Sequence, residues 1–150
     1  MRRTLLTLAV PLAIATASSA SAHHNHRVFY DQCKSITIEG RIDSVQWKDP
    51  HTLIVVKLDD GSTYNVDWAG LRGLTRNGTM ITAKNALIVG ARITVTGNPI
   101  RAAAQIREHL PDFTSGVNPR TIDLRLIRVV GSSLNWGRFP DAIPSNCDGK

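Results

Sequence analysis

The hydrophobic and polar positions of residues 36–42 alternate along the chain, with isoleucines on one face and polar residues between them. A period of two is typical of a strand that is buried on one face only. Gly40 lies inside the pattern, which indicates a bend or bulge of the kind that curls a strand around a barrel corner. We therefore predict a first, curved strand here.

Four further segments predict strands by the same criteria. The second and third, residues 51–58 and 62–68, are separated by residues 59–61, an Asp-Asp-Gly sequence that is typical of a hairpin turn. The fourth and fifth are residues 90–99 and 120–130, and the fifth places Ile122, Leu124 and Leu126 on one face.

The connections between these strands differ in character. Residues 69–78 predict a short irregular or helical connection that ends at an Asn-Gly pair. Residues 101–110 contain good helix formers and stop before Pro111, so the segment 100–119 predicts an inserted helix and loop. The chain after Gly131 is rich in Gly, Ser, Pro and Asn and predicts an extended strap that Cys147 pins down.

Five short strands with a helical piece between the third and fourth follow the order of the OB-fold, a partly open five-stranded barrel. We predict an all-β, OB-like barrel with a short helical insertion and an extended C-terminal tail. Coiling so small a sheet protects its edges. The expected divisions are a signal peptide (1–22), a His-rich N-terminal segment (23–34), the barrel (35–130) and the tail (131–150).

The N-terminus has the pattern of a bacterial secretory signal peptide. Two arginines (residues 2–3) precede an uncharged apolar run over residues 5–17, which is shorter than the roughly 20 residues of a membrane anchor. Ala20 and Ala22 form the small-x-small pattern of a cleavage site, so we expect a mature chain that begins at His23. The protein is then periplasmic or secreted, without a stable membrane anchor. The general secretory route is favoured over the twin-arginine route, because the polar residue usually found before the paired arginines is absent.

Charge adds little to this picture. The whole chain has 18 basic and 12 acidic residues, and the expected cleavage removes two arginines, which lowers the net charge from +6 to +4. Aromatic residues make up 5%, too few to suggest a surface on which bases stack. We expect no nucleic-acid partner, and the composition identifies no other.

Cys33 and Cys147 are the only cysteines of the chain. In an oxidising compartment an even pair predicts a disulfide. Closing so long a loop would stabilise the fold by roughly 4–5 kcal/mol in the chain-entropy model. Two free thiols are the alternative, whereas a metal site at the pair is disfavoured because neither cysteine has a neighbour at ligand spacing.

The chain contains a set of short motifs: His23-His24, Tyr30-Asp31, Gly40 to Ile42, Trp47, Pro50-His51 and the "ITVTGNP" strand. In these motifs it resembles a family of small exported bacterial proteins of unknown function. The chain departs from the family pattern in Asp49 in place of Asn, in Gly90-Ala91 in place of Gly-Asp, and in a longer segment after Pro99. The resemblance covers about residues 20–100; it implies an OB-like barrel and export, and no known activity.

The expected cleavage would place His23 at the start of the mature chain, followed closely by His24 and His26. Its α-amine and imidazole titrate near 7.7 and 6.5 (typical values), so together they can chelate a metal ion at neutral pH. A third nitrogen would complete a T-shaped Cu(II) site, and His51 is held by the predicted strand after Pro50. We predict a copper site, or less favourably a zinc site, at His23 with His51 or His24, with His26 contributing less. Such a site requires His51 and residues 30–31 to lie on one side of the barrel.

Other interpretations remain open. A His cluster behind a signal peptide can be a solvated linker that binds metals weakly. OB barrels bind ligands on the face of strands two and three, so Trp47, Tyr64 and Trp68 are candidates for a groove that binds another ligand or a protein, although Trp68 also fits a core position. The sequence contains no nucleophile elbow, phosphate-binding loop or CxxC motif, and therefore does not favour an enzyme.

Overall fold

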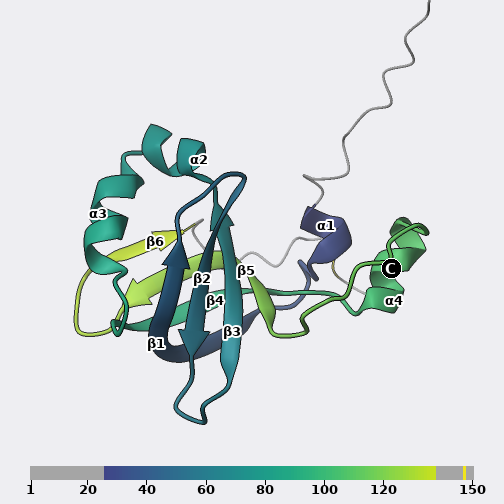
Figure 1. Cartoon of the computed structure of the whole chain (residues 1–150), viewed down its shortest axis with the longest axis horizontal. Coiled ribbons are helices and arrows are strands. Elements are labelled where there is room, and N and C mark those ends of the chain that lie inside the picture. Colours follow the sequence, from purple (N-terminus) through teal and green to yellow (C-terminus); the bar gives the residue numbers. More distant parts are fainter. Residues whose placement is uncertain (1–25, 138–146, 148–150) are drawn as a thin grey trace, which may run out of the picture.

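The structure, a computed structural model, describes residues 26–137 and Cys147. Figure 1 shows a small barrel with short helices around it. In chain order the elements are α1 (His26–Phe29), β1 (Ile36–Gln46), β2 (His51–Lys57), β3 (Thr63–Ala69), α2 (Leu71–Arg76), α3 (Thr79–Ala86), β4 (Arg92–Pro99), α4 (Ala103–His109), β5 (Thr121–Val129) and β6 (Asn135–Gly137).

The first five strands close into a barrel. β1 pairs antiparallel with both β2 and β4, β2 pairs with β3, and β4 pairs with β5. A parallel pairing between β3 and β5 closes the ring, so the described chain has the predicted OB-like strand order. The predicted all-β barrel is confirmed.

β1, which pairs with two neighbours, has an irregularity along its pairing with β2. The register with β2 shifts between Ile42 and Ser44, slightly beyond the position at which the sequence predicted a bend. Gly40 has a different role, because a Cβ atom there would lie 2.4 Å from the carbonyl oxygen of Lys57. The glycine therefore allows close approach of β2 rather than forming the bulge itself.

The barrel interior is filled by aliphatic side chains from alternating positions, and Leu74 of α2 and Ala83 of α3 join this core at one end. In β5 the predicted alternation of Ile122, Leu124 and Leu126 is interrupted, because Ile127 is buried in place of Leu126. The pairing with β4 is irregular between Leu124 and Leu126, and this irregularity moves the next inward position by one residue.

Three described elements were not predicted: α1, α3 and β6. β6 pairs with the second half of β5, so the first part of the predicted tail belongs to the sheet. The predicted helix over residues 101–110 is confirmed as α4. The predicted signal peptide with Ala20 and Ala22, the residues His23 and His24, and most of the tail beyond Gly137 lie outside the described residues.

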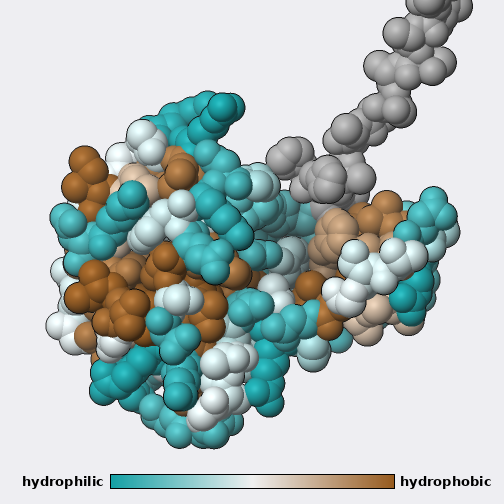
Figure 2. All heavy atoms as spheres, viewed as in Figure 1, coloured by the Kyte–Doolittle hydropathy of each residue, from teal (hydrophilic) through white to brown (hydrophobic). Residues whose placement is uncertain are grey.

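The surface has an apolar region around α3 and the β5–β6 turn. In the space-filling view, hydrophobic residues gather on the side where Figure 1 places α3 and β6 (Figure 2). The exposed large aliphatic residues of the described chain are Ile81, Ile88, Val89, Val130 and Leu134. None of the helices within residues 26–137 has the length and apolar character needed to cross a membrane.

Candidate functional site

A cleft of about 580 Å³ lies beside the closure of the barrel. One edge of β5 pairs with β3 at Thr121–Asp123 and with β6 at Leu126–Arg128. Leu124 and Arg125 lie between these two pairings and line the cleft. The cleft is also bounded by the end of β3, by α2 and by β6, so it is formed where β5 changes its partner.

His51 enters this cleft from the first position of β2. Its backbone pairs with Ala69 at the end of β3, directly before the turn into α2. Gly70 lets the two segments meet, since a Cβ there would lie 2.4 Å from the carbonyl oxygen of Pro50. Asp49 accepts a hydrogen bond of 3.3 Å from the backbone N–H of Arg72 and so supports the start of α2. The Asp-Pro-His corner thus holds His51 on the scaffold.

His26 of α1 lies opposite His51 in the same cleft. The two ring centroids are 5.6 Å apart, with an angle of 51° between the ring planes. Nδ1 of His26 is 3.1 Å from Oδ2 of Asp123 on β5, and the His26 ring stacks on Tyr30 at a centroid distance of 6.0 Å. Three separate elements, α1, β2 and β5, therefore bring two imidazoles and a carboxylate together.

Tyr30 fixes the position of α1 against β3. Its side chain is 7% exposed, and its hydroxyl donates a hydrogen bond to Oδ2 of Asp67. Burial, followed by this hydrogen bond and the negative charges of Asp67 and Asp123, raises the pKa of Tyr30 far above its usual value. The phenol therefore stays neutral at physiological pH and remains a donor to Asp67.

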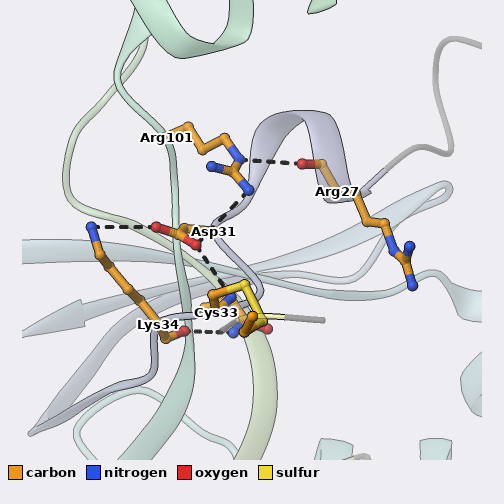
Figure 3. The surroundings of a disulfide bond; sticks show 7 residues. Arg27, Asp31, Cys33, Lys34 and Arg101 are labelled. Atoms are coloured by element: carbon orange, nitrogen blue, oxygen red, sulfur yellow. Dashed lines mark hydrogen bonds and ion pairs between the residues drawn. A yellow bond between two sulfur atoms is a disulfide. The ribbon is translucent and has the colours of Figure 1, made fainter. Parts of the chain in front are cut away.

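The segment after Tyr30 is attached to the barrel by Asp31 and a disulfide (Figure 3). Asp31 accepts a hydrogen bond of 3.2 Å from the backbone N–H of Cys33, and its carboxylate pairs with Lys34 at 3.3 Å and Arg101 at 3.8 Å. Cys33 is bonded to Cys147 with an S–S distance of 2.06 Å, which confirms the predicted disulfide. Because the His26 ring contacts both Tyr30 and His51, His51 and the segment 30–31 lie on one side of the barrel, as a shared site requires.

The three aromatic residues predicted to form a groove are only partly brought together. Trp68 is 8% exposed and both packs in the core and lines the cleft. Trp47 packs against Trp68 at a centroid distance of 6.4 Å, and Tyr64 packs against the core; neither belongs to the cleft lining. On the opposite side of the cleft Trp136 of β6 donates a hydrogen bond of 3.3 Å to Oγ1 of Thr82.

Several cleft residues were missed by sequence reasoning. Trp136 was missed because β6 was not predicted, and Asp123 because an outward-facing residue of a predicted strand has no distinguishing pattern. Asn98 lies within the strand that was predicted from "ITVTGNP", is 2% exposed, and donates a hydrogen bond of 2.6 Å to the carbonyl of Lys34. The signal that could have found Asn98 is its amide side chain within a half-buried strand, because a buried amide needs hydrogen-bond partners.

Within the part of the chain that the structure describes, no three His, Cys, Asp or Glu side chains converge closely enough to hold a metal ion. His26 and His51 are thus a pair of candidate ligands, to which residues outside the described range would have to add.

A known family matches a range of the chain that includes most residues of this site. The model of a family of unknown function, DUF6152, matches residues 12–107. The chain belongs to this family. The matched range includes His26, Tyr30, His51 and Asp67, whereas Asp123 and Trp136 lie beyond it. The predicted resemblance to a family of unknown function is therefore confirmed.

No curated protein matches the chain. Among solved structures, the chain is similar to one in the crystal structure of the S. pombe Stn1-ten1 complex, with 12% identity and a TM-score of 0.44. The similarity covers 65% of this chain and 59% of the other, so this chain spans well under two thirds of that neighbour.

Proposed function

We propose that the protein is an exported β-barrel binding module that holds Cu(II), and Zn(II) less strongly, at the cleft between α1 and β2. The ligands are the amine and ring of His23 at the mature N-terminus, with His51 or His24 as partner. The observation that carries this proposal is the position of α1, whose His26 ring lies 5.6 Å from the ring of His51.

Chain length supports the proposal. His23 precedes His26 by three residues, and an extended chain advances at most about 3.6 Å per residue, so the two Cα atoms are within about 11 Å of each other. A terminus that starts at His23 can therefore deliver its amine and imidazole to the cleft that contains His51.

The anchoring of the next residues lowers the cost of forming such a site. Ordering a free terminus costs conformational entropy for each residue, which metal bonds must offset. Tyr30 is buried and Asp31 is paired with Lys34, so the residues that follow His26 are already held in place. Nitrogen ligands in a tetragonal arrangement favour Cu(II), and Cu(II) also binds most tightly of the divalent first-row ions.

Export is part of the proposal, because only cleavage between Ala22 and His23 releases the amine. It is supported by the signal-like N-terminus and by a disulfide, which is typical of oxidising compartments. Mass spectrometry of the exported protein is expected to show a chain that begins at His23; any other N-terminus would remove the chelate.

Calorimetric titration of the untagged mature protein with Cu(II) at neutral pH tests the site. His23→Ala and His51→Ala should each weaken binding by at least about tenfold, a loss of 1.4 kcal/mol or more. One alanine added before His23 should have a similar effect, because it moves the amine away from the ring. His109→Ala, on the exposed end of α4, is the control that should leave the affinity unchanged. Equal affinities for wild type, His23→Ala and His51→Ala would overturn the proposal.

The cleft itself favours a second candidate function, the binding of a non-metal ligand. Trp68 and Trp136 supply aromatic surface, and Asn98 and Arg125 supply hydrogen-bonding groups beside it. If the titration detects no copper site, this module is the function that the geometry supports next. Quenching of tryptophan fluorescence on ligand addition, lost in Trp136→Ala, would identify it.

A further inference from the structure

We infer that His26 is itself a metal ligand and that Asp123 is the residue that positions it, an inference that rests on the proposed function and extends its ligand set. The sequence alone favours His23, His24 and His51 and expects less of His26. The placement of His26 in the cleft argues that it is a ligand alongside His51.

The distance between the two imidazoles suits one shared ion. A metal bound about 2.0–2.1 Å from a ring nitrogen lies about 3.2 Å from the ring centroid. Two such rings around one ion have centroids about 4.5 Å apart at a right angle and about 6.4 Å apart when opposed. The observed 5.6 Å between the ring centroids of His26 and His51 lies within this range, so the spacing of the rings is compatible with one shared ion.

Asp123 gives His26 the environment of a metal ligand. Histidines that bind metals usually donate their second ring N–H to a carboxylate or carbonyl, which fixes the tautomer and the ring orientation. Here Nδ1 of His26 is 3.1 Å from Oδ2 of Asp123, which leaves Nε2 for an ion. Stacking on Tyr30, whose hydroxyl is bonded to Asp67, holds the ring from one side.

The charges of the surroundings also favour a cation. Asp67 and Asp123 are paired positions of the parallel β3–β5 ladder, and both are only partly exposed. Arg125 also lines the cleft and opposes the effect. Carboxylates attract a cation bound near them, so Asp67 and Asp123 favour a cation at His26 over an anion.

The rings of His26 and His51 by themselves form a two-imidazole site. Imidazole nitrogens suit Cu(II). The ligands of the proposed function would add to this pair.

The inference is tested by electron paramagnetic resonance and calorimetry on the mature protein loaded with one equivalent of Cu(II). His26→Ala should remove one nitrogen from the hyperfine pattern and weaken binding at least about tenfold. His26→Gln keeps a donor to Asp123 and so preserves the attachment of α1, and it should lose the same nitrogen. Circular dichroism and thermal unfolding check that each variant is folded.

The role of Asp123 is tested by a measurement that the loss of a purely structural residue would not change. Asp123→Asn should weaken copper binding by about 10–100-fold, keep the number of nitrogens, and change the spectrum because the ring is held differently. Asp123→Glu, which retains a carboxylate, should recover part of the affinity. Asp112→Asn, in an exposed loop after α4, is the control and should bind as wild type does.

The outcomes separate the two proposals. If His26→Ala and His26→Gln keep both affinity and nitrogen count while His23→Ala lowers them, His26 is no ligand and the proposed function stands. If the His26 variants lower affinity while an alanine added before His23 does not, the N-terminal chelate fails and the site is the His26–His51 pair. Copper binding that is unaffected by all of these variants overturns both.

Discussion

At the scale of single residues, Tyr30 joins the end of α1 to the barrel through a side chain that is both buried and hydrogen-bonded. We predict that Tyr30→Phe lowers the free energy of unfolding by about 1.5–3 kcal/mol, because the Asp67 carboxylate loses its phenol donor. Urea unfolding measures this loss. Tyr64→Phe, in the same barrel and without a carboxylate partner among the described residues, is the control and should lose clearly less. Equal losses would mean that the Asp67 bond contributes nothing specific.

The same tyrosine predicts a pH dependence. Its pKa is raised in the folded state, so ionisation in the unfolded chain, which begins near pH 10, favours unfolding. The contribution of Tyr30 to stability should therefore be complete below about pH 10 and decline above it, by up to about 1.4 kcal/mol per pH unit. The difference between wild type and Tyr30→Phe, measured from pH 8 to 11, isolates this effect from lysine titration. A difference that does not shrink above pH 10 would contradict it.

At the scale of elements, β4 and β5 touch so closely at Gly97 that no side chain fits. A Cβ there would lie 2.2 Å from the carbonyl oxygen of Asp123 and 2.4 Å from Cγ2 of Ile122. We predict that Gly97→Ala lowers the free energy of unfolding by about 2–3 kcal/mol, because the closed barrel cannot shift a strand cheaply. Gly73→Ala in α2, where the nearest atom is 3.6 Å away, should instead be neutral or stabilising. Comparable losses in the two variants, measured by urea unfolding, would refute the close contact.

At the scale of the whole molecule, the Cys33–Cys147 disulfide joins two positions that are 114 residues apart, next to the cleft residue Gln32. We predict that the double substitution Cys33→Ser, Cys147→Ser lowers the free energy of unfolding by about 4–5 kcal/mol, since the unfolded chain regains the freedom of a long loop. Wild type treated with a reductant should match the double variant, and reductant should not affect the variant itself. An unfolding midpoint that is the same with and without the bond would count against this account.

Local patterns along the chain were sufficient to predict the barrel. Strand periodicity depends on which face of a short segment is buried, and that information is contained in neighbouring residues. It located all five barrel strands, and the cysteine pair was assigned because only one pairing is possible. It placed Leu126 wrongly inside because an irregularity in pairing depends on the partner strand. It missed β6, whose three residues are too few to display a period.

The candidate site depended on tertiary structure instead. His26, His51 and Asp123 come from segments far apart in the sequence, and their approach depends on the β3–β5 closure and on Tyr30, neither of which leaves a local pattern. The sequence could therefore name His51 as a candidate from its position after Pro50 and His26 as a lesser one, but not Asp123 or the contacts that bring these residues together. Contacts between distant segments are decided by the packing of the whole barrel, because the energy that holds them is shared among residues that no short stretch contains.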